Sequence, residues 1–316
     1  MTDKAERYGS GAFFESLCDC LGLHGRPELI RHNTNLIYDG GEFVVRLTPN
    51  SFRPREEVER ELHWMKYVAT RTPDVVQLYG DDRELTRQFE FDGEEFTVTM
   101  LEKIIGEPIG AESWNGAHFE RLGRLTGFMH RIGQDYQAPA GFELTEWDAT
   151  PDASLADHLP DDDRDLSGLS DLVLEHMAAM PRGLGSYGPI HYDIHSGNYL
   201  ITPAGRMVLF DFENSCCGHY INDIAVVLYY ARLHKLSELD DDFDARFLAA
   251  FWKGYAGEYP VPEDQVEHIP WLLLNRGLIV YGYVLKIWPG ELDDEQRFYL
   301  GRIEESISRA REALAL

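Results

Sequence analysis

Long apolar runs and cysteine are scarce in this 316-residue sequence, and both absences narrow its class. The longest apolar stretch covers residues 277–285, between Arg276 and Lys286, and is far too short to span a bilayer. The four cysteines form one C-x-C and one adjacent pair, spacings that fit neither a zinc site nor a secreted disulfide framework. We therefore expect reduced cysteines, no membrane partner and a cytoplasmic location.

Basic residues are also few. The 29 lysines and arginines stand against 55 aspartates and glutamates, which gives a net charge of −26. Nucleic acids and anionic membrane surfaces repel such a field, so we expect neither as a partner. The charge favours a cationic partner, although an acidic surface that keeps the protein soluble explains it equally simply.

The first hundred residues are dominated by strand patterns. Residues 34–48 flank the turn Gly40-Gly41, and residues 88–101 flank Asp92-Gly93, so both segments are predicted to be hairpins. Residues 56–69 place apolar side chains at helical spacing between the hairpins.

Helical periods dominate beyond residue 104. They are predicted at 118–132, 166–180, 223–235, 243–259, 263–288 and 292–314. We expect an α+β, two-lobed fold with a small antiparallel-sheet N-lobe over residues 1–103 and a larger, mainly helical C-lobe over residues 104–316.

Two short motifs carry the chemistry. Residues 190–198 read Ile-His-Tyr-Asp-Ile-His-Ser-Gly-Asn, and residues 210–213 read Phe-Asp-Phe-Glu. Two short strands and a turn at 203–206 separate them, and a hairpin centred on that turn pairs Asn198 with Asp211. Cross-strand partners have Cβ atoms roughly 5 Å apart. The sequence thus predicts an amide oxygen beside a carboxylate, with Asp193 on the preceding loop.

Two such oxygen ligands suit Mg²⁺, which completes its shell with phosphate oxygens and water. A third carboxylate, Asp193, lies five residues before the asparagine and can accept the proton of an attacking hydroxyl. This is the division of labour in kinase-type phosphoryl transfer. The alternative is a loop in which these side chains only cap turns.

With these motifs the chain resembles the aminoglycoside phosphotransferase and choline kinase family, which shares the protein kinase fold. The resemblance extends from residues 35–38 and 43–46 to Phe-Trp-Lys-Gly-Tyr at 251–255, where it leans toward the homoserine kinase-like branch. It implies an ATP-dependent kinase, with GTP not excluded. It also implies Asp193 as catalytic base, with Asn198 and Asp211 as Mg²⁺ ligands.

Four further residues are candidates for supporting roles, and two of them, Asp223 and His191, match positions of the family. Asp223 matches an aspartate that braces the catalytic loop, although an acid at a helix N-terminus is an equally simple interpretation. His191 matches a histidine packed beneath the loop. His195 is either on the substrate side or an ordinary loop residue. Glu213 replaces the glycine of protein kinases and either contacts a second metal or is a surface acid.

The nucleotide-covering part departs from the protein kinase pattern, because the first lobe has no G-x-G-x-x-G. The turn at 31–35, with Asn35, is left to cover the phosphates. Arg46 takes the position of the phosphate-binding lysine, on the strand face opposite Val45, or is a solvated arginine. Glu61 is the predicted partner of Arg46, with Glu57 as second choice.

The acceptor is predicted to be a small, amine-bearing alcohol: an aminoglycoside, an amino alcohol or a hydroxy amino acid. Acidic clusters at 161–163 and 240–242 and several aromatic residues of the second lobe suit a cation, although loops and helix core explain them too. A protein serine/threonine kinase and a non-catalytic nucleotide-binding protein remain as alternatives, and the oligomeric state cannot be read.

Overall fold

The computed structural model describes residues 7–32, 34–80, 84–110, 113–151, 164–235, 242–288 and 290–316. By internal contacts the chain forms two compact units. Unit 1 comprises residues 1–108, 137–143 and 199–213, and unit 2 comprises residues 109–136, 144–198 and 214–316. The predicted lobe boundary at residues 103 and 104 stays a prediction. Within the described ranges, no helix has the length and apolarity needed to cross a membrane.

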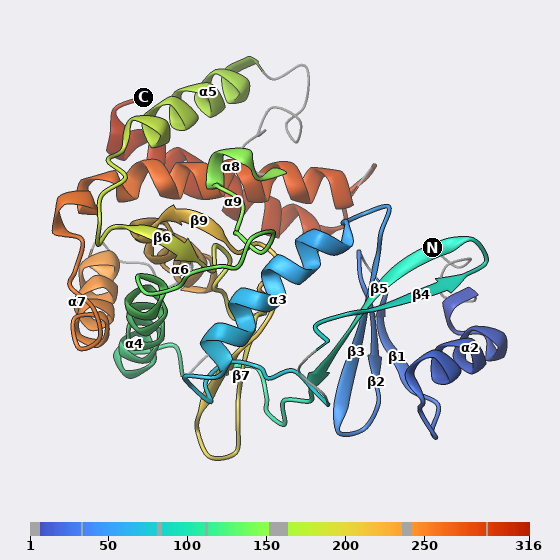
Figure 1. Cartoon of the computed structure of the whole chain (residues 1–316). Helices are drawn as coiled ribbons and strands as arrows, with labels where there is room; N and C mark the ends of the chain where they lie inside the picture. The colour runs from blue at the N-terminus through green and yellow to red at the C-terminus, as the bar shows by residue number, and fades with distance from the viewer. Residues whose placement is uncertain are drawn as a thin grey trace. The chain divides into compact units, whose positions relative to one another are not determined.

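Unit 1 is built on an antiparallel five-stranded sheet (Figure 1). The strand order is β1 (Glu28–His32), β2 (Leu36–Asp39), β3 (Phe43–Pro49), β5 (Glu94–Glu102), β4 (Arg87–Phe91). Both predicted hairpins are present, because β2 pairs with β3 and β4 pairs with β5. The sheet and the helical second unit confirm the predicted α+β class.

One face of this sheet forms an aromatic core. Helix α2 (Gly11–Leu21) places Phe13 against Tyr38, Phe89 and Phe96, with ring centroids 5.4–6.4 Å apart. These rings and Val45 are at most 4% exposed. Successive strand residues point to opposite faces, so Arg46 lies on the other side, facing helix α3 (Arg55–Ala69).

The short hairpin of the two motifs also belongs to unit 1. β7 (Tyr199–Ile201) and β8 (Met207–Leu209) pair Tyr199 with Leu209. The predicted register, Asn198 opposite Asp211, requires Tyr199 opposite Phe210 and is wrong by one residue. The loop has three residues instead of four, because Thr202 N–H donates to the Arg206 carbonyl (2.8 Å) and the loop closes through a glycine at φ 77°.

Unit 2 is mainly helical. Its longer helices are α4 (Gly116–Gly133), α5 (Arg164–Ala179), α6 (Tyr220–Lys235), α7 (Phe243–Tyr255), α8 (Ile269–Ile287) and α9 (Asp294–Leu314). The helix predicted at 263–288 is divided into a 3₁₀ turn (Glu263–His268) and α8, because Pro270 fits only the first turn of an α-helix. A two-stranded sheet joins β6 (Tyr187–Ile190) to β9 (Cys216–His219).

Helices α4 and α7 touch backbone to backbone at glycines, most closely at Gly123 and Gly254. A Cβ on Gly123 would lie 2.0 Å from the Phe251 carbonyl oxygen, and one on Gly254 would lie 1.9 Å from the Glu120 carbonyl oxygen. Side chains separate most helix pairs by 8–10 Å, so only glycine permits this approach. The contact fixes Tyr255, the last residue of α7, beside α4.

Candidate active site

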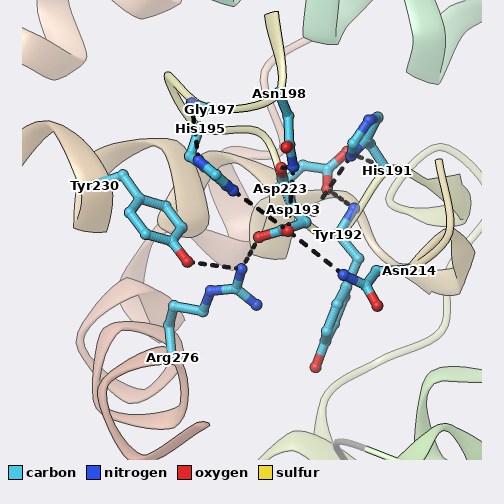
Figure 2. A network of polar contacts seen from close by, with 10 residues as sticks. All are labelled: His191, Tyr192, Asp193, His195, Gly197, Asn198, Asn214, Asp223, Tyr230 and Arg276. Carbon is cyan, nitrogen blue, oxygen red and sulfur yellow. Dashed lines mark hydrogen bonds and ion pairs between the residues drawn. The ribbon is translucent and has the colours of Figure 1, made fainter. Parts of the chain in front are cut away.

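The loop between β6 and β7 centres on the Asp193 carboxylate (Figure 2). Asn198 Nδ2 donates to the Asp193 carbonyl (2.9 Å) and to its Oδ2 (3.2 Å), and Asn214 Nδ2 donates to the same Oδ2 (3.4 Å). The bonds from Asn198 close the loop on itself across five residues. The structure therefore brings the predicted base and one predicted metal ligand together.

Arg276, on α8, also bonds this carboxylate, and the sequence analysis missed it. Its Nη2 donates to Asp193 Oδ1 and to the Tyr230 hydroxyl (3.1 Å), which comes from α6. The Arg276 side chain is 6% exposed, and the Asp193 side chain is 15% exposed. An arginine in this position pairs with the carboxylate and fixes its orientation.

His195 lies on the other side of the same carboxylate. Its Nδ1 accepts a hydrogen bond from Gly197 N–H (3.0 Å), so in the neutral ring the proton is on Nε2. Nε2 lies 3.5 Å from Asp193 Oδ2, and the ring packs on Tyr230 (4.6 Å between centroids). His195 is thus a neighbour of Asp193, while its part in substrate binding stays a prediction.

The loop is held in a strained conformation by Asp223. Tyr192 has φ 70°, a left-handed value that is rare for a side chain of its size. Asp223 on α6 accepts from Tyr192 N–H (2.7 Å) and His191 N–H (3.0 Å). His191 Nδ1 accepts in turn from Asp193 N–H (3.3 Å). These bonds place Asp223 and His191 beneath the loop, where the resemblance expected them.

Asp223 is itself positioned by a buried histidine. His130 Nε2 lies 3.2 Å from Asp223 Oδ2, and its Nδ1 lies 2.8 Å from the Tyr255 hydroxyl. Burial lowers the pKa of His130, so the ring is neutral at pH 7, with Nε2 donating to the carboxylate and Nδ1 accepting from Tyr255. Through Tyr255, the α4–α7 contact is connected to the loop that carries Asp193.

A second group of polar residues lies in unit 1. Arg46 Nη1 pairs with Glu61 Oε1 (2.7 Å), the ion pair that the helical pattern predicted, and Arg53 Nη1 bonds Glu61 Oε2 (2.5 Å). Burial would raise the pKa of Glu61, but the two guanidinium groups lower it. Nε and Nη2 of Arg46 are buried and have no hydrogen-bond partner within the described residues. Two buried donors of a cation are therefore available to an anionic ligand.

Asp211 and Glu213 belong to the same group. Burial and the neighbouring Asp211 carboxylate raise the pKa of Glu213. Burial by itself would lower the pKa of Arg46, but the carboxylates of Glu61, Glu213 and Asp211 raise it. Asn35 donates to Glu213 (2.8 Å) and accepts from Thr48 (2.8 Å). The side chain of Asn35 thus holds Glu213. That the turn containing Asn35 covers the nucleotide phosphates stays a prediction.

The two predicted metal ligands are oxygen donors, the kind that a hard divalent cation takes. Asn198, in unit 2, uses its Nδ2 on Asp193, so its Oδ1 is the atom left for a metal. Asp211, in unit 1, offers a carboxylate. Within the described part of the chain, no group of three or more His, Cys, Asp or Glu side chains can hold a metal by itself. The assignment of Asn198 and Asp211 as Mg²⁺ ligands stays a prediction.

Unit 2 thus contains five of the predicted site residues, and unit 1 contains the other five. The first set is Asp193, Asn198, His191, His195 and Asp223, and the second is Arg46, Glu61, Asn35, Asp211 and Glu213. The acidic stretches proposed for the acceptor, residues 161–163 and 240–241, lie outside the described residues.

The residues that sequence reasoning missed are Arg276, Tyr230, Asn214, His130 and Arg53. Two of them left a signal. Arg276 is a charged residue within the strongly apolar segment 269–285, and His130 falls on the inward face of the period at 118–132. Both are buried, and buried polar side chains of this kind are paired.

A protein-family model described as "Phosphotransferase enzyme family" matches residues 31–264. The chain belongs to this family. It is therefore a kinase, as the two motifs indicated. Amicoumacin kinase of Bacillus subtilis (strain 168) is 27% identical over 251 residues, which cover 77% of this chain and 74% of that protein. Homoserine kinase of Pseudomonas aeruginosa (strain LESB58) is 28% identical over 167 residues, about half of each chain (50% and 49%).

Solved structures of the family share the fold. Amicoumacin kinase hAmiN in complex with AMP-PNP, Ca²⁺ and Ami has a TM-score of 0.83 at 22% identity, covering 98% of this chain and 96% of that one. A microcompartment-associated aminopropanol kinase has a TM-score of 0.72 at 19% identity, with 92% of each chain covered. These likenesses confirm the kinase-like fold.

Proposed function

We propose that the chain transfers the γ-phosphoryl group of ATP to a hydroxyl of a small, amine-bearing molecule. The observation that carries the proposal is the Asp193 carboxylate, held by Asn198, Asn214 and Arg276 on a loop that Asp223 braces. A fixed, ionised carboxylate within a strained loop is an arrangement suited to accept a proton.

In the proposed step, the acceptor hydroxyl gives its proton to Asp193. Its oxygen forms a bond to the γ-phosphorus, and the bond from that phosphorus to the bridging oxygen breaks. The bridging oxygen leaves with the electron pair on ADP. His195 and His191 each accept a hydrogen bond from a backbone N–H of the loop, so we infer that the transfer is direct and forms no phosphoenzyme.

Unit 1 supplies the proposed nucleotide contacts. Arg46 directs its two unpartnered donors to phosphate oxygens while Glu61 and Arg53 hold its orientation. We assign Mg²⁺ to Asp211 and Asn198, with Glu213 as an additional acid beside Asp211. The metal, when bound, offsets the charge of the phosphates and of the transferring group.

The acceptor class is supported by the names of the relatives. They include amicoumacin kinase, homoserine kinase, aminopropanol kinase and spectinomycin phosphotransferase. Each name denotes a small molecule, which favours a small-molecule acceptor over a protein. The net charge of −26 speaks against nucleic acid and for a cationic group on the acceptor. A cytoplasmic location stays a prediction.

The test is ADP release with Mg-ATP and a panel of hydroxylated amines, aminoglycosides, choline-like alcohols and hydroxy amino acids. Asp193→Asn should lower kcat by at least about 10²-fold, the scale of general-base catalysis. It should leave the stabilisation of the fold by Mg-nucleotide intact, because Asp193 serves the acceptor. Asp171→Asn, at an exposed position on α5, is the matched control and should behave as wild type.

Activity of Asp193→Asn equal to wild type would disprove the assignment of the base. Mg-dependent nucleotide binding with phosphorylation of a protein substrate, and of no small alcohol, would favour a protein kinase. Absence of nucleotide binding would reject the proposed function.

A further inference from the structure

The Asp193 carboxylate has four lone-pair directions, and the fold leaves one of them open. A carboxylate accepts about two hydrogen bonds at each oxygen. Oδ2 accepts from Asn198 and Asn214, with His195 as a third neighbour at 3.5 Å. Oδ1 accepts from Arg276 alone among the described residues. A proton from an acceptor hydroxyl therefore has its place at Oδ1.

That place is next to a positive charge. Arg276 bonds the same Oδ1, and its guanidinium carbon lies 5.2 Å from the Tyr230 ring centroid and 5.9 Å from that of Tyr192 (Figure 2). The two rings and the low exposure of the side chain, 6%, restrict its movement. A hydroxyl bound to Oδ1 consequently has the guanidinium as its neighbour.

The charge decides which group can accompany that hydroxyl. An ammonium beside Arg276 is repelled, and water screens this repulsion less where side chains are as little exposed as those of Arg276 and Asp193, 6% and 15%. A carbonyl or carboxylate oxygen is attracted. We propose that Arg276 selects acceptors whose reacting hydroxyl lies one or two carbons from a carbonyl or carboxylate oxygen, with any amine farther away.

This inference rests on the proposed function and narrows its substrate class. An α- or β-hydroxy carbonyl group places a hydrogen-bond donor for Asp193 beside an oxygen of negative charge or partial charge, which the positive charge of Arg276 attracts. Hydroxy acids, their esters and their amides fit, whereas a simple amino alcohol offers no partner to the guanidinium. The argument uses the position and charge of Arg276 and needs no spare N–H on it.

The experiment compares acceptors in matched sets. Each set holds a hydroxy amino acid, its primary amide and the amino alcohol of the same carbon skeleton without the carbonyl oxygen. kcat/KM is measured for each by ADP release with Mg-ATP. The attraction of one nearby charge, at a dielectric constant between those of water and of a protein surface, corresponds to roughly a 10- to 100-fold preference, so carbonyl-bearing members should be favoured by that factor.

Variants of Arg276 separate selection from folding. Arg276→Met should reduce the preference for carbonyl-bearing acceptors toward unity, and Arg276→Lys should keep part of it. The matched control is Arg309→Met, at an exposed arginine on α9 that pairs with Glu305, and it should leave the preference unchanged. Circular dichroism establishes that each variant is folded.

Two results would overturn the inference in a working kinase. One is a wild-type enzyme that prefers the alcohols without a carbonyl oxygen, and this measurement needs no variant. The other is an Arg276→Met enzyme that keeps the wild-type ratio. A protein that binds no Mg-nucleotide and releases no ADP fails the proposed function instead, so the two failures are distinguishable.

Discussion

At the residue scale, one buried glutamate is shared by two arginines. Glu61 is 2% exposed and takes one bond from Arg46 and one from Arg53. Arg53 also pairs with Glu57 (3.6 Å). Glu61 thus occupies only Nη1 of Arg46, whose Nε and Nη2 are buried and have no hydrogen-bond partner among the described residues. Buried donors without a partner are costly, so they favour a ligand such as a nucleotide phosphate that accepts from them.

Removal of Arg46 should therefore affect the nucleotide more than the fold. Arg46→Met should raise the KM for ATP roughly 10- to 100-fold, the scale of one lost charge-assisted contact, and Arg46→Lys should raise it less. Stability should change modestly, since Arg53 still pairs with Glu61. Steady-state kinetics at varied ATP gives the answer.

The matched control is Arg87→Met, at an exposed arginine on β4 of the same sheet. It should leave the KM for ATP unchanged. An Arg46→Met enzyme with the wild-type KM would contradict the assignment of Arg46 to the phosphates.

At the element scale, the α4–α7 contact sets a steric limit that can be tested with single methyl groups. Gly254→Ala places a Cβ against the backbone of α4 and should lower the free energy of unfolding by about 1–3 kcal/mol or more. Gly301→Ala, on exposed α9 with no atom within 4 Å, should instead raise it by about 0.5–1 kcal/mol. Urea titration measures both, and equal effects would contradict the close contact.

The elements that the sequence predicted are those with a regular apolar period. Helix α3 and the two hairpins of unit 1 were predicted because their buried side chains recur at helical or alternating spacing. Strand β1 was missed because it is an edge strand with exposed side chains, so no alternation marks it. The β7–β8 register was missed by one residue because loop length depends on the left-handed Gly205.

The residues of the candidate site also fall into two groups, those that the sequence predicted and those that only the structure shows. Asp193, Asn198 and Asp211 are close in sequence and were predicted from their spacing. Arg276 and His130 lie 83 and 93 residues from the partners they bond, and only the packing of helices brings them there. Their contacts depend on tertiary packing, so a single sequence can indicate that these side chains are buried but not which residue each of them bonds.

At the scale of the whole molecule, buried neutral histidines make stability depend on pH. Burial lowers the pKa of His118 and of His219 to about 4 in each case. The unfolded chain binds these protons near pH 6.5, so protons favour unfolding. The stabilisation is fully present above pH 6.5 and is lost as pH falls toward 4, by up to about 3 kcal/mol for each histidine.

Thermal unfolding between pH 7.5 and 4.5 tests this, with His118→Leu beside wild type. The variant should lose less stability across that interval than wild type does. His24→Gln, at an exposed histidine, is the control and should follow wild type. A His118→Leu curve parallel to that of wild type would contradict the buried, neutral state of His118.

The glycine contact between α4 and α7 also limits which substitutions this sequence can accept during evolution. A Cβ on Gly123 or Gly254 would meet a carbonyl oxygen of the opposite helix. Every residue has that oxygen, so no substitution on the facing helix can make room. Loss of either glycine thus has no second-site suppressor at the point of contact, and relief would require the two helices to move apart. Because Tyr255 joins this contact to His130, such a shift would reach the catalytic loop.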